Sequence, residues 1–413
     1  MRLLPTVSIS FGTTSIRLLS LLLITKYVAS IGGPTAIALL GQFQNLQQLM
    51  ISLTTFGSSQ GVTKLISENR TSGFEEIFST ARTLIFVASF IIGLIFLIFH
   101  SDITLKIFSK DNYEIIIIVL GLLIFFNAAN TLLIASLNGV MNTKLWSLVN
   151  LNQIICTLIC VLLGGTLLGL KGIFLGFPIS HFLSFFLNYL LIKNRHETIQ
   201  WIPIFKINVE VLKRLVAFSG FTFISMLIVP WSLTVVRSHI ITNLGDLSAG
   251  YWQSILFICT TFQMLITTTM SVYFLPKVSS SSSNFEILLE IKRIFRLALL
   301  IVFIGAGLVY LSREFLITII FDERFLPSAD YLLFQLLGTM LRVLAWIYSY
   351  ALLATGRLQI LIFLELVFTT LFVVLSINLI NSSGIMGATH AYLLINGAYL
   401  ITVYSLCRKI FAK

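Results

Sequence analysis

Charged residues are scarce in this sequence. Its 413 residues include 27 Lys or Arg and 16 Asp or Glu, about 10% of the chain, while hydrophobic residues make up 57%. A soluble domain carries roughly 25% charged residues on average. Apolar runs of about 20 residues, the length that crosses a bilayer as a helix, recur along the whole chain. We therefore expect a multi-pass membrane protein, and most soluble enzymes are excluded.

The sequence also lacks the side-chain clusters that carry catalysis or hold metals. Its four cysteines all fall inside apolar runs, and its five histidines are scattered without metal-ligand spacing. The nearest approach to a phosphate-binding loop, Gly164 to Lys171, lacks the Gly-Lys-Ser/Thr ending of nucleotide-driven proteins. We predict a transporter rather than an enzyme, with no catalytic residue, metal or cofactor.

The apolar runs predict an all-α membrane protein with about twelve transmembrane helices. They begin near residues 7, 37, 77, 113, 145, 172, 215, 250, 294, 331, 358 and 384. Loops on the side of the N-terminus hold 17 Lys or Arg, and the opposite loops hold five. Because basic loops stay in the cytoplasm, both termini are predicted to be cytoplasmic. The net charge of +11 is thus explained by basic residues in cytoplasmic loops, which orient the protein in the membrane. We therefore expect no nucleic-acid partner.

The two halves of the sequence resemble each other at a nearly constant offset. Lys26, Gly33 and Gln42 correspond to Arg237, Gly245 and Gln253 at offsets of 211 or 212, and Gly172-Ile173 corresponds to Gly384-Ile385 at 212. A shared offset at separate places favours a duplicated unit of six helices, and an even number makes the two copies parallel.

This repeat predicts two six-helix lobes around a central cavity. The N-terminal lobe is expected over residues 1–192 and the C-terminal lobe over 215–413, joined by a cytoplasmic interfacial linker at 193–214. Two parallel lobes are suited to alternating access, in which one lobe rocks against the other around a site near the midplane.

The most informative polar residue is Arg17. It lies about 10 residues, or roughly 15 Å, inside the first span, where a charge is costly unless it is paired or hydrated. No acidic residue occurs in the central part of the first six spans. An anion from outside the protein could neutralise Arg17; the alternatives are snorkelling to the interface or binding to backbone carbonyls.

Other polar residues at membrane depth are further candidates. Asn45 and Gln48 on the second span and Gln253 on the eighth belong to polar helix faces that would line the cavity, with ordinary helix-to-helix hydrogen bonding as the alternative. Lys26 and Arg237 lie nearer the outer membrane surface, so snorkelling is an alternative to anion binding for both.

Arg342 and Glu365 form a separate case in the second half. Arg342 is central in the tenth span, and Glu365 is the one acidic residue at depth in the C-terminal lobe. The two side chains could form a structural ion pair, Arg342 could bind substrate, or Glu365 could bind a proton that couples transport to a gradient. The sequence leaves these alternatives open.

Several short motifs resemble bacterial lipid-linked oligosaccharide flippases of the multidrug/oligosaccharidyl-lipid/polysaccharide (MOP) superfamily, most closely the O-antigen and enterobacterial-common-antigen type. The motifs are Arg17 through Lys26 to Gly33-Pro34, Gln42-Phe43, Gly61-Val62-Thr63-Lys64, residues 271–277, Leu364-Glu365, and Gly384 through His390-Ala391-Tyr392. The resemblance implies a MOP-type fold around a cationic cavity. It also implies a role for Lys64 in substrate binding.

The resemblance implies a substrate and a location. Proteins of this kind move an undecaprenyl-pyrophosphate-linked saccharide, such as an O-antigen repeat unit for lipopolysaccharide, across the bacterial inner membrane from the cytoplasmic to the periplasmic leaflet. Expected partners are that glycolipid, membrane lipids, and the polymerase and chain-length proteins of the same pathway. A pyrophosphate with about two negative charges matches guanidinium and ammonium groups that have no internal counter-ion.

Two other functions compete with this one. A cation-coupled exporter of small molecules, similar to the MATE transporters, would use the same fold, but a pump for cationic drugs is expected to hold carboxylates at depth, where only Glu365 qualifies. A glycan polymerase or ligase would present a large outer loop, whereas the outer loops here are short.

Overall fold

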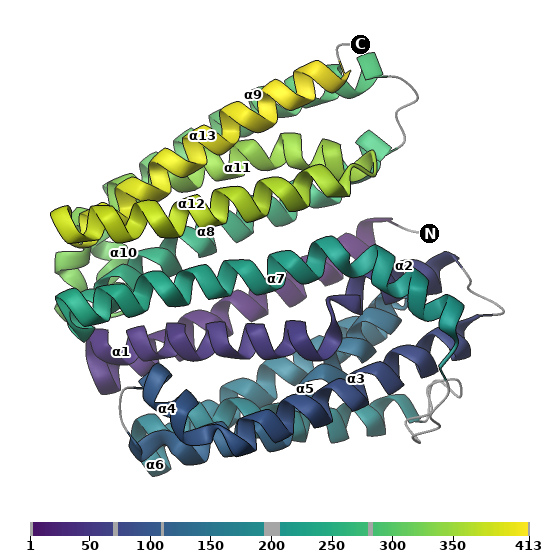
Figure 1. Ribbon diagram of the computed structural model, residues 1–413, viewed down its shortest axis with the longest axis horizontal. Coiled ribbons are helices and arrows are strands. Elements are labelled where there is room, and N and C mark those ends of the chain that lie inside the picture. Colours follow the sequence, from purple (N-terminus) through teal and green to yellow (C-terminus); the bar gives the residue numbers. More distant parts are fainter. Residues whose placement is uncertain (1–2, 69–72, 109–110, 194–206, 280–283, 412–413) are drawn as a thin grey trace. The chain divides into compact units, whose positions relative to one another are not determined.

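The computed structural model describes residues 3–68, 73–108, 111–193, 207–279 and 284–411, and these residues are almost entirely helical (Figure 1). The elements are α1 (Leu3–Thr55), α2 (Ser58–Glu68), α3 (Phe74–Ile98), α4 (His100–Phe108), η1 (Asp111–Tyr113), α5 (Glu114–Gly139), α6 (Thr143–Lys193), α7 (Val209–Leu244), α8 (Asp246–Ser279), α9 (Asn284–Leu311), α10 (Arg313–Ile320), η2 (Glu323–Tyr331), α11 (Leu332–Ala354), α12 (Leu358–Ser383) and α13 (Ile385–Phe411). Most of the expected linker, residues 194–206, lies outside the described ranges.

Within those ranges, nine helices are long and apolar enough to cross a membrane. Two of them, α1 with 53 residues and α6 with 51, are each long enough to cross twice. Counting both twice and adding α8 agrees with the expectation of about twelve spans, although the exact number stays a prediction.

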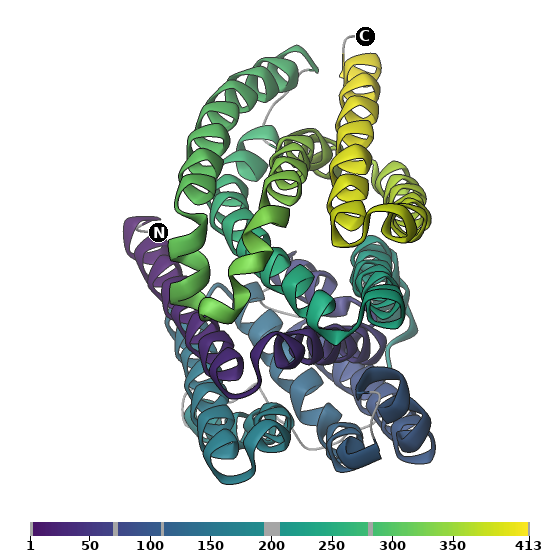
Figure 2. The ribbon, with the colours of Figure 1, turned by 90° about the vertical axis from the view of Figure 1, so that its left-hand side faces the viewer.

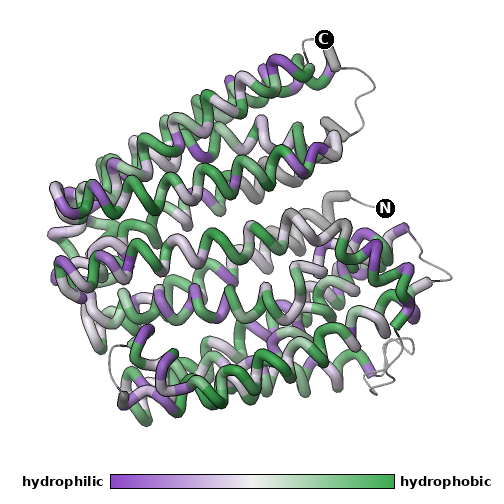
Figure 3. Tube along the Cα trace, viewed as in Figure 1, coloured by the Kyte–Doolittle hydropathy of each residue, from purple (hydrophilic) through white to green (hydrophobic). Residues whose placement is uncertain are grey.

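The side chains on the outside of these helices are apolar. Leu167 is 79% exposed and Leu311 is 81% exposed, while serine, threonine and asparagine side chains are buried between helices. Figure 3 shows hydrophobic residues along most of the length of the helices. An apolar exterior over a partly polar interior is what a lipid environment selects. The chain is therefore a multi-pass membrane protein, as predicted.

Both long helices break at a glycine with a left-handed φ. Gly33 has φ 61° and ψ −154°, and Gly169 has φ 61° and ψ −140°. Only glycine adopts this region readily, because a Cβ atom would strain the backbone. Pro34 follows Gly33, and its fixed φ suits the first turn of the next helical segment.

The break in α6 has a counterpart between α12 and α13. Gly384 there has φ 60° and ψ −143°, close to the values of Gly169. Three residues later, a Cβ on Gly172 would overlap the carbonyl of Gly164, and a Cβ on Gly387 would overlap the carbonyl of Leu379. The matching motif is thus Gly-x-x-Gly at an offset of 215, so the expected pairing of Gly172 with Gly384 at 212 is wrong in register by three residues.

The chain divides into two compact units. The first contains Met1–Ile31 and Gln42–Pro230, and the second contains Gly32–Gly41 and Trp231–Lys413. Two helices, α1 and α7, contribute to both units. The lobe boundaries expected from the sequence stay a prediction.

In the first unit, α5 packs against α2, α3, α4 and α6 (Figure 1). Buried aliphatic residues of α2, α3, α5 and α6 form one core, and Phe43 lies within 5.2 to 6.4 Å of the rings of Phe108, Phe174 and Phe177 in another part of this unit. In the second unit, α11 packs against α8, α9, α12 and α13 (Figure 2).

Candidate functional site

Arg17 of α1 contacts α6 in the first unit. Its Nη2 donates a 2.7 Å hydrogen bond to Oδ1 of Asn150, whose own Nδ2 donates to the carbonyl of Trp146 at 2.8 Å. One turn earlier on both helices, the hydroxyls of Thr13 and Ser147 lie 2.5 Å apart. The bond to Asn150 orients the guanidinium, and the Thr13–Ser147 contact joins α1 and α6 without touching it.

The partner of Arg17 is neutral. Asn150 is fully buried, whereas the side chain of Arg17 remains exposed, and no ion pair to Arg17 is found in the part of the chain that the structure describes. An amide oxygen can accept a hydrogen bond from a guanidinium, but it does not cancel its charge. The net positive charge expected at this position is therefore retained.

The other candidates of the first unit occupy several environments. Lys26 follows Arg17 by nine residues on α1, which on a straight helix places it on the opposite side, and its side chain is exposed. On the second half of α1, Asn45 is half-buried and Gln48 is exposed. The structure thus presents Lys26 and Gln48 at surfaces of the unit.

Lys64 lies on the short helix α2, near acidic and basic neighbours. Its Nζ is 4.0 Å from Oε1 of Glu68, and Oε2 of the same carboxylate accepts a 3.1 Å hydrogen bond from Arg214. All three side chains are exposed, and such surface pairs are weak. One carboxylate shared by two cations leaves this cluster with a net positive charge.

Arg237 and Gln253, both predicted from the sequence, come together in the second unit. Arg237 of α7 is 1% exposed and donates from Nη2 to Oε1 of Gln253 on α8, and its guanidinium lies 5.5 Å from the ring centre of Trp252. Its Nε and Nη1 have no hydrogen-bond partner. Gly41 of α1 packs on Gln253, since an added Cβ there would overlap the amide group. Arg237 is thus a buried cation with donors to spare.

Arg342 and Glu365 form the ion pair that the sequence left open. Nη2 of Arg342 on α11 lies 3.1 Å from both carboxylate oxygens of Glu365 on α12, and the guanidinium lies 4.6 Å from the ring centre of Tyr399 on α13. The two side chains are 18% and 8% exposed. The ion pair and the contact with Tyr399 link α11, α12 and α13 of the second unit. The two charges of the pair neutralise each other.

Other buried polar residues of the first unit join helices to one another. Asn130 of α5 is fully buried, donates to the carbonyl of His181 at 2.9 Å, and accepts from Asn188 at 3.0 Å. Asn152 donates to Oδ1 of Asn188 at 2.7 Å. These asparagines are thus engaged in helix-to-helix hydrogen bonding.

The sequence interpretation missed Asn150, Trp252 and His181. Ser147 and Asn150 are three residues apart and therefore share a helix face, which was an available signal. Nothing local indicated which helix that face would meet. Arg17 in the first unit thus has a neutral hydrogen-bond partner, and Arg237 in the second unit has two guanidinium nitrogens without one; guanidinium groups of this kind are suited to anions.

Comparisons with known proteins identify the family and the fold of the chain. A model of the family described as Polysaccharide biosynthesis protein matches residues 45–330. The lipid III flippase of Escherichia coli (strain K12) is 23% identical over 414 residues, which cover 97% of this chain and 96% of that protein.

Solved structures show the same fold. A multidrug resistance MATE family transporter of the MOP superfamily, in an inward-facing conformation, is 15% identical with a TM-score of 0.81, and the match covers 96% of this chain and 94% of that chain. The lipid II flippase MurJ, in an inward closed conformation, is 15% identical with a TM-score of 0.74, covering 97% and 87%. The solved structures confirm the MOP-type fold expected from the sequence, and the family model and the lipid III flippase confirm the family resemblance.

Proposed function

The chain belongs to the polysaccharide biosynthesis protein family, and from that premise we propose that it is a flippase, not an enzyme, which carries a lipid-linked oligosaccharide across the membrane. The observation that carries the proposal is Arg17, a cation at membrane depth whose partner is the neutral amide of Asn150. The lipid III flippase, related along nearly the whole chain, supports a lipid-linked glycan as the substrate class.

We take the substrate to be an undecaprenyl-pyrophosphate-linked oligosaccharide of the O-antigen type. Its pyrophosphate cannot enter hydrocarbon without compensation of its charge, and a guanidinium offers two parallel donors to such a group. Arg17 is the principal ligand in this proposal, and Arg237 supplies spare donors in the second unit.

The remaining candidates have supporting roles. Lys26 and Lys64 attract the anionic headgroup electrostatically, while the amides of Asn45, Gln48 and Gln253 offer donors and acceptors to sugar hydroxyls. Arg342 is already neutralised by Glu365, so it contributes less than the other cations unless that pair opens.

The transport direction is the one that the resemblance to lipid-linked oligosaccharide flippases implies. In this proposal the protein lies in the bacterial inner membrane with both termini in the cytoplasm, and it moves the glycolipid from the cytoplasmic to the periplasmic leaflet by alternating access of its two halves. A product in the periplasmic leaflet would serve a polymerase and chain-length proteins of lipopolysaccharide assembly, which are the proposed protein partners.

A cation-coupled exporter of small molecules is the second candidate, favoured by the fold shared with the MATE transporter. The Arg342–Glu365 pair counts against it. Glu365 already has a cationic partner at 3.1 Å, which reduces its ability to attract a cationic drug.

Complementation tests the proposal directly. Strains that each lack one defined lipid-linked glycan flippase are given the wild-type gene, and restored surface glycan identifies the substrate. Arg17→Ala should abolish the restored export at normal protein level, Arg17→Lys should restore part of it, and Lys106→Ala, at an exposed residue of α4, should have no effect. Drug resistance without glycan export, in cells lacking their own pumps, would instead support the exporter.

A further inference from the structure

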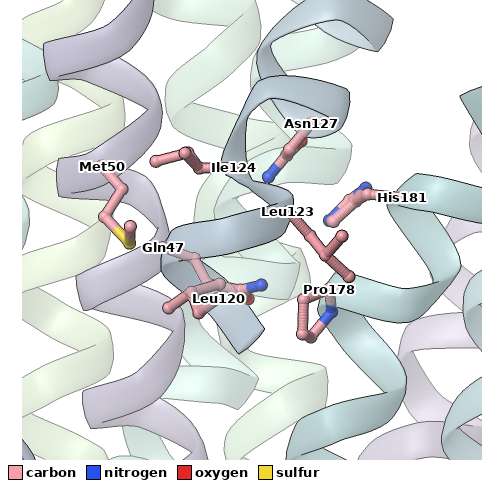
Figure 4. A pocket seen from close by; sticks show the side chains of 8 residues that line it. All are labelled: Gln47, Met50, Leu120, Leu123, Ile124, Asn127, Pro178 and His181. Carbon is pink, nitrogen blue, oxygen red and sulfur yellow. The ribbon is translucent and has the colours of Figure 1, made fainter. Parts of the chain in front are cut away.

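A small hollow in the first unit contains a histidine that the proposed function does not use. It lies between the second half of α1, the middle of α5 and the second half of α6 (Figure 4). Figure 4 shows Gln47 of α1, Asn127 of α5 and His181 of α6 around it, with Pro178 beside His181. The rest of the wall is apolar, formed by Met50 and residues of α5.

Neutral amides surround the imidazole. Nδ1 of His181 lies 3.2 Å from Nε2 of Gln153 on the same helix, and Gln47 and Asn127 reach the hollow from the two other helices. Nε2 of Gln47 is buried and has no hydrogen-bond partner. An amide offers either a donor or an acceptor after rotation by half a turn. This set of groups can therefore satisfy an imidazole in its neutral or its protonated form.

No fixed charge competes at this place. The groups that face the hollow from α1 and α5 are uncharged, and His181 is the one titratable residue among those that line it. Of the charged residues described in these helices, Arg17 is bound to Asn150, Glu114 to Ser101, and Lys171 lies over the ring of Tyr113, while Lys26, Lys144 and Lys193 are not among the residues that line the hollow. A proton gained by His181 would thus change the local charge from zero to one.

The hollow also lies where α6 is able to change shape. Pro178 has no backbone N–H, so the carbonyl of Phe174 lacks its usual helical partner. The carbonyl of His181 accepts a hydrogen bond from Asn130 of α5 at 2.9 Å. Charge at His181 is therefore applied three residues from a proline that lacks its helical hydrogen bond, at a residue whose carbonyl is bonded to α5.

We propose that the imidazole of His181, in the hollow between α1, α5 and α6, is a proton-binding site through which a proton gradient drives transport. The proposal rests on the flippase function. Glu365 is less suited to this role, because its protonation would leave Arg342 buried without a counter-ion. Protonation of His181 breaks no ion pair, and the side-chain amides of Gln47, Asn127 and Gln153 offer oxygen acceptors to the cation that forms.

The test uses the full-length protein in liposomes loaded with undecaprenyl-pyrophosphate-linked N-acetylglucosamine. The quantity measured is the ratio of this lipid between the two leaflets at steady state, with and without an imposed pH difference. If one proton moves per lipid, the ratio for the wild type should change about tenfold per pH unit. A purely structural role of His181 would alter the rate at which this ratio is reached and leave the ratio itself unchanged.

His181→Asn should keep lipid movement but hold the ratio near one at any pH difference. The matched control is His390→Asn on α13, where the ring packs edge-to-face on Phe334 at 4.3 Å; its ratio should follow the wild type. If His181→Asn does not fold, Gln47→Met fills the hollow with a side chain of similar length and should weaken the response while the imidazole remains.

The outcomes distinguish failure of the proton site from failure of the proposed flippase function. A wild-type protein that moves lipid but ignores the pH difference, or a His181→Asn variant with the full response, overturns the proton site and leaves the flippase intact. A wild-type protein that moves no glycolipid at all overturns the flippase itself.

Discussion

Arg17 and its partner together carry a net positive charge, because the partner is a neutral amide. The guanidinium needs an acceptor to hold its orientation, and Asn150 provides one at 2.7 Å without a negative charge. A carboxylate at the same place would hold the guanidinium equally well and cancel its charge. If Arg17 binds an anion as we propose, Asn rather than Asp at residue 150 is what leaves its charge available.

Asn150→Asp should abolish glycan export while the protein still accumulates in the membrane. The new carboxylate forms an ion pair with Arg17, so the pyrophosphate loses its principal ligand, and we expect export to fall by at least about tenfold, the effect of roughly 1.4 kcal/mol. Surface glycan and protein level are measured together in the complemented strain.

Ser147→Ala is the matched control for that variant. It removes the neighbouring hydrogen bond between α1 and α6 and leaves Arg17 untouched, so export should stay near normal. Normal export by the Asn150→Asp protein would show that the charge of Arg17 is not needed.

The pair of Arg342 and Glu365 should behave as a structural unit. Glu365→Leu alone leaves a buried guanidinium uncompensated and should lower the free energy of unfolding by about 3–5 kcal/mol. The double variant Arg342→Met with Glu365→Leu removes both charges and should regain most of that loss. Thermal unfolding of the detergent-solubilised proteins gives the comparison.

Export by the same double variant separates the roles that the sequence left open. If it transports glycan at the wild-type rate, the pair is structural, and both substrate binding by Arg342 and coupling by Glu365 are excluded. If it folds stably but does not transport, the assignment of the pair to structure alone is wrong.

The depth of a charged residue in the membrane could be predicted from the sequence, but the residue that it contacts could not. The position of Arg17 inside an apolar run and the absence of nearby acids were sufficient to predict an uncompensated cation. Its contact with Asn150 spans 133 residues, and that of Arg342 with Glu365 spans 23. Such contacts depend on how helices rotate against each other, which a hydropathy pattern does not determine.

The break in α6 shows how two glycines can reverse a helix with almost no loop. Gly169 adopts a φ that other residues avoid, and Gly172 allows the chain to pass against the carbonyl of Gly164. The same pair recurs as Gly384 and Gly387. Glycine is required at the first position of the motif because of its left-handed φ, and at the second because a Cβ would overlap a backbone carbonyl.

Alanine at these two glycines should therefore have different effects. Gly169→Ala meets open space and bears only backbone strain, about 1–3 kcal/mol, whereas Gly172→Ala should cost more because the overlapping atom belongs to the backbone and does not move easily. The unfolding temperature of purified protein measures both.

Gly307→Ala in α9 is the control for this comparison. Residue 307 is helical with nothing near an added Cβ, so alanine should be neutral or stabilising by up to about 1 kcal/mol. A Gly172→Ala protein as stable as the Gly307→Ala protein would contradict the close packing described here.

In this region the sequence predicted where helices begin, but it did not predict the correct alignment of the two repeats. Apolar runs gave the beginnings of spans near residues 145, 172, 358 and 384, in agreement with α6, α12 and α13. In the sequence the repeat aligns on the Gly-Ile pairs at residues 172 and 384, which are identical neighbouring residues. The feature that recurs is a backbone conformation, and only dihedral angles identify which glycine adopts it.

For the whole molecule, the distribution of basic residues predicts which ends face the cytoplasm. Single cysteines are introduced at four exposed positions in a variant without the native cysteines: Lys106 of α4, Lys144 of α6, Glu314 of α10 and Lys409 of α13. In intact cells, a membrane-impermeant maleimide should label residues 106 and 314 alone. Residues 144 and 409 should react only after the membrane is opened, and labelling of either in intact cells would reverse or break the predicted topology.

Fold and function were predictable at this scale for a physical reason. Membrane insertion imposes helices of nearly fixed length, so composition and periodicity suffice to recognise the architecture. The division of the chain into units was harder, because α1 and α7 each contribute to both. A segment that belongs to two units leaves no change of composition to mark the boundary.

The tight glycine turn within α6 also bears on how the protein is made. Because the two halves of α6 meet without an intervening polar loop, biosynthesis has almost no hydrophilic segment to pull through the bilayer at this point. In the folded chain the two halves already form a hairpin closed by the contact between Gly164 and Gly172. A ribosome that pauses between them would leave a half-finished hairpin whose apolar face has nothing to pack against.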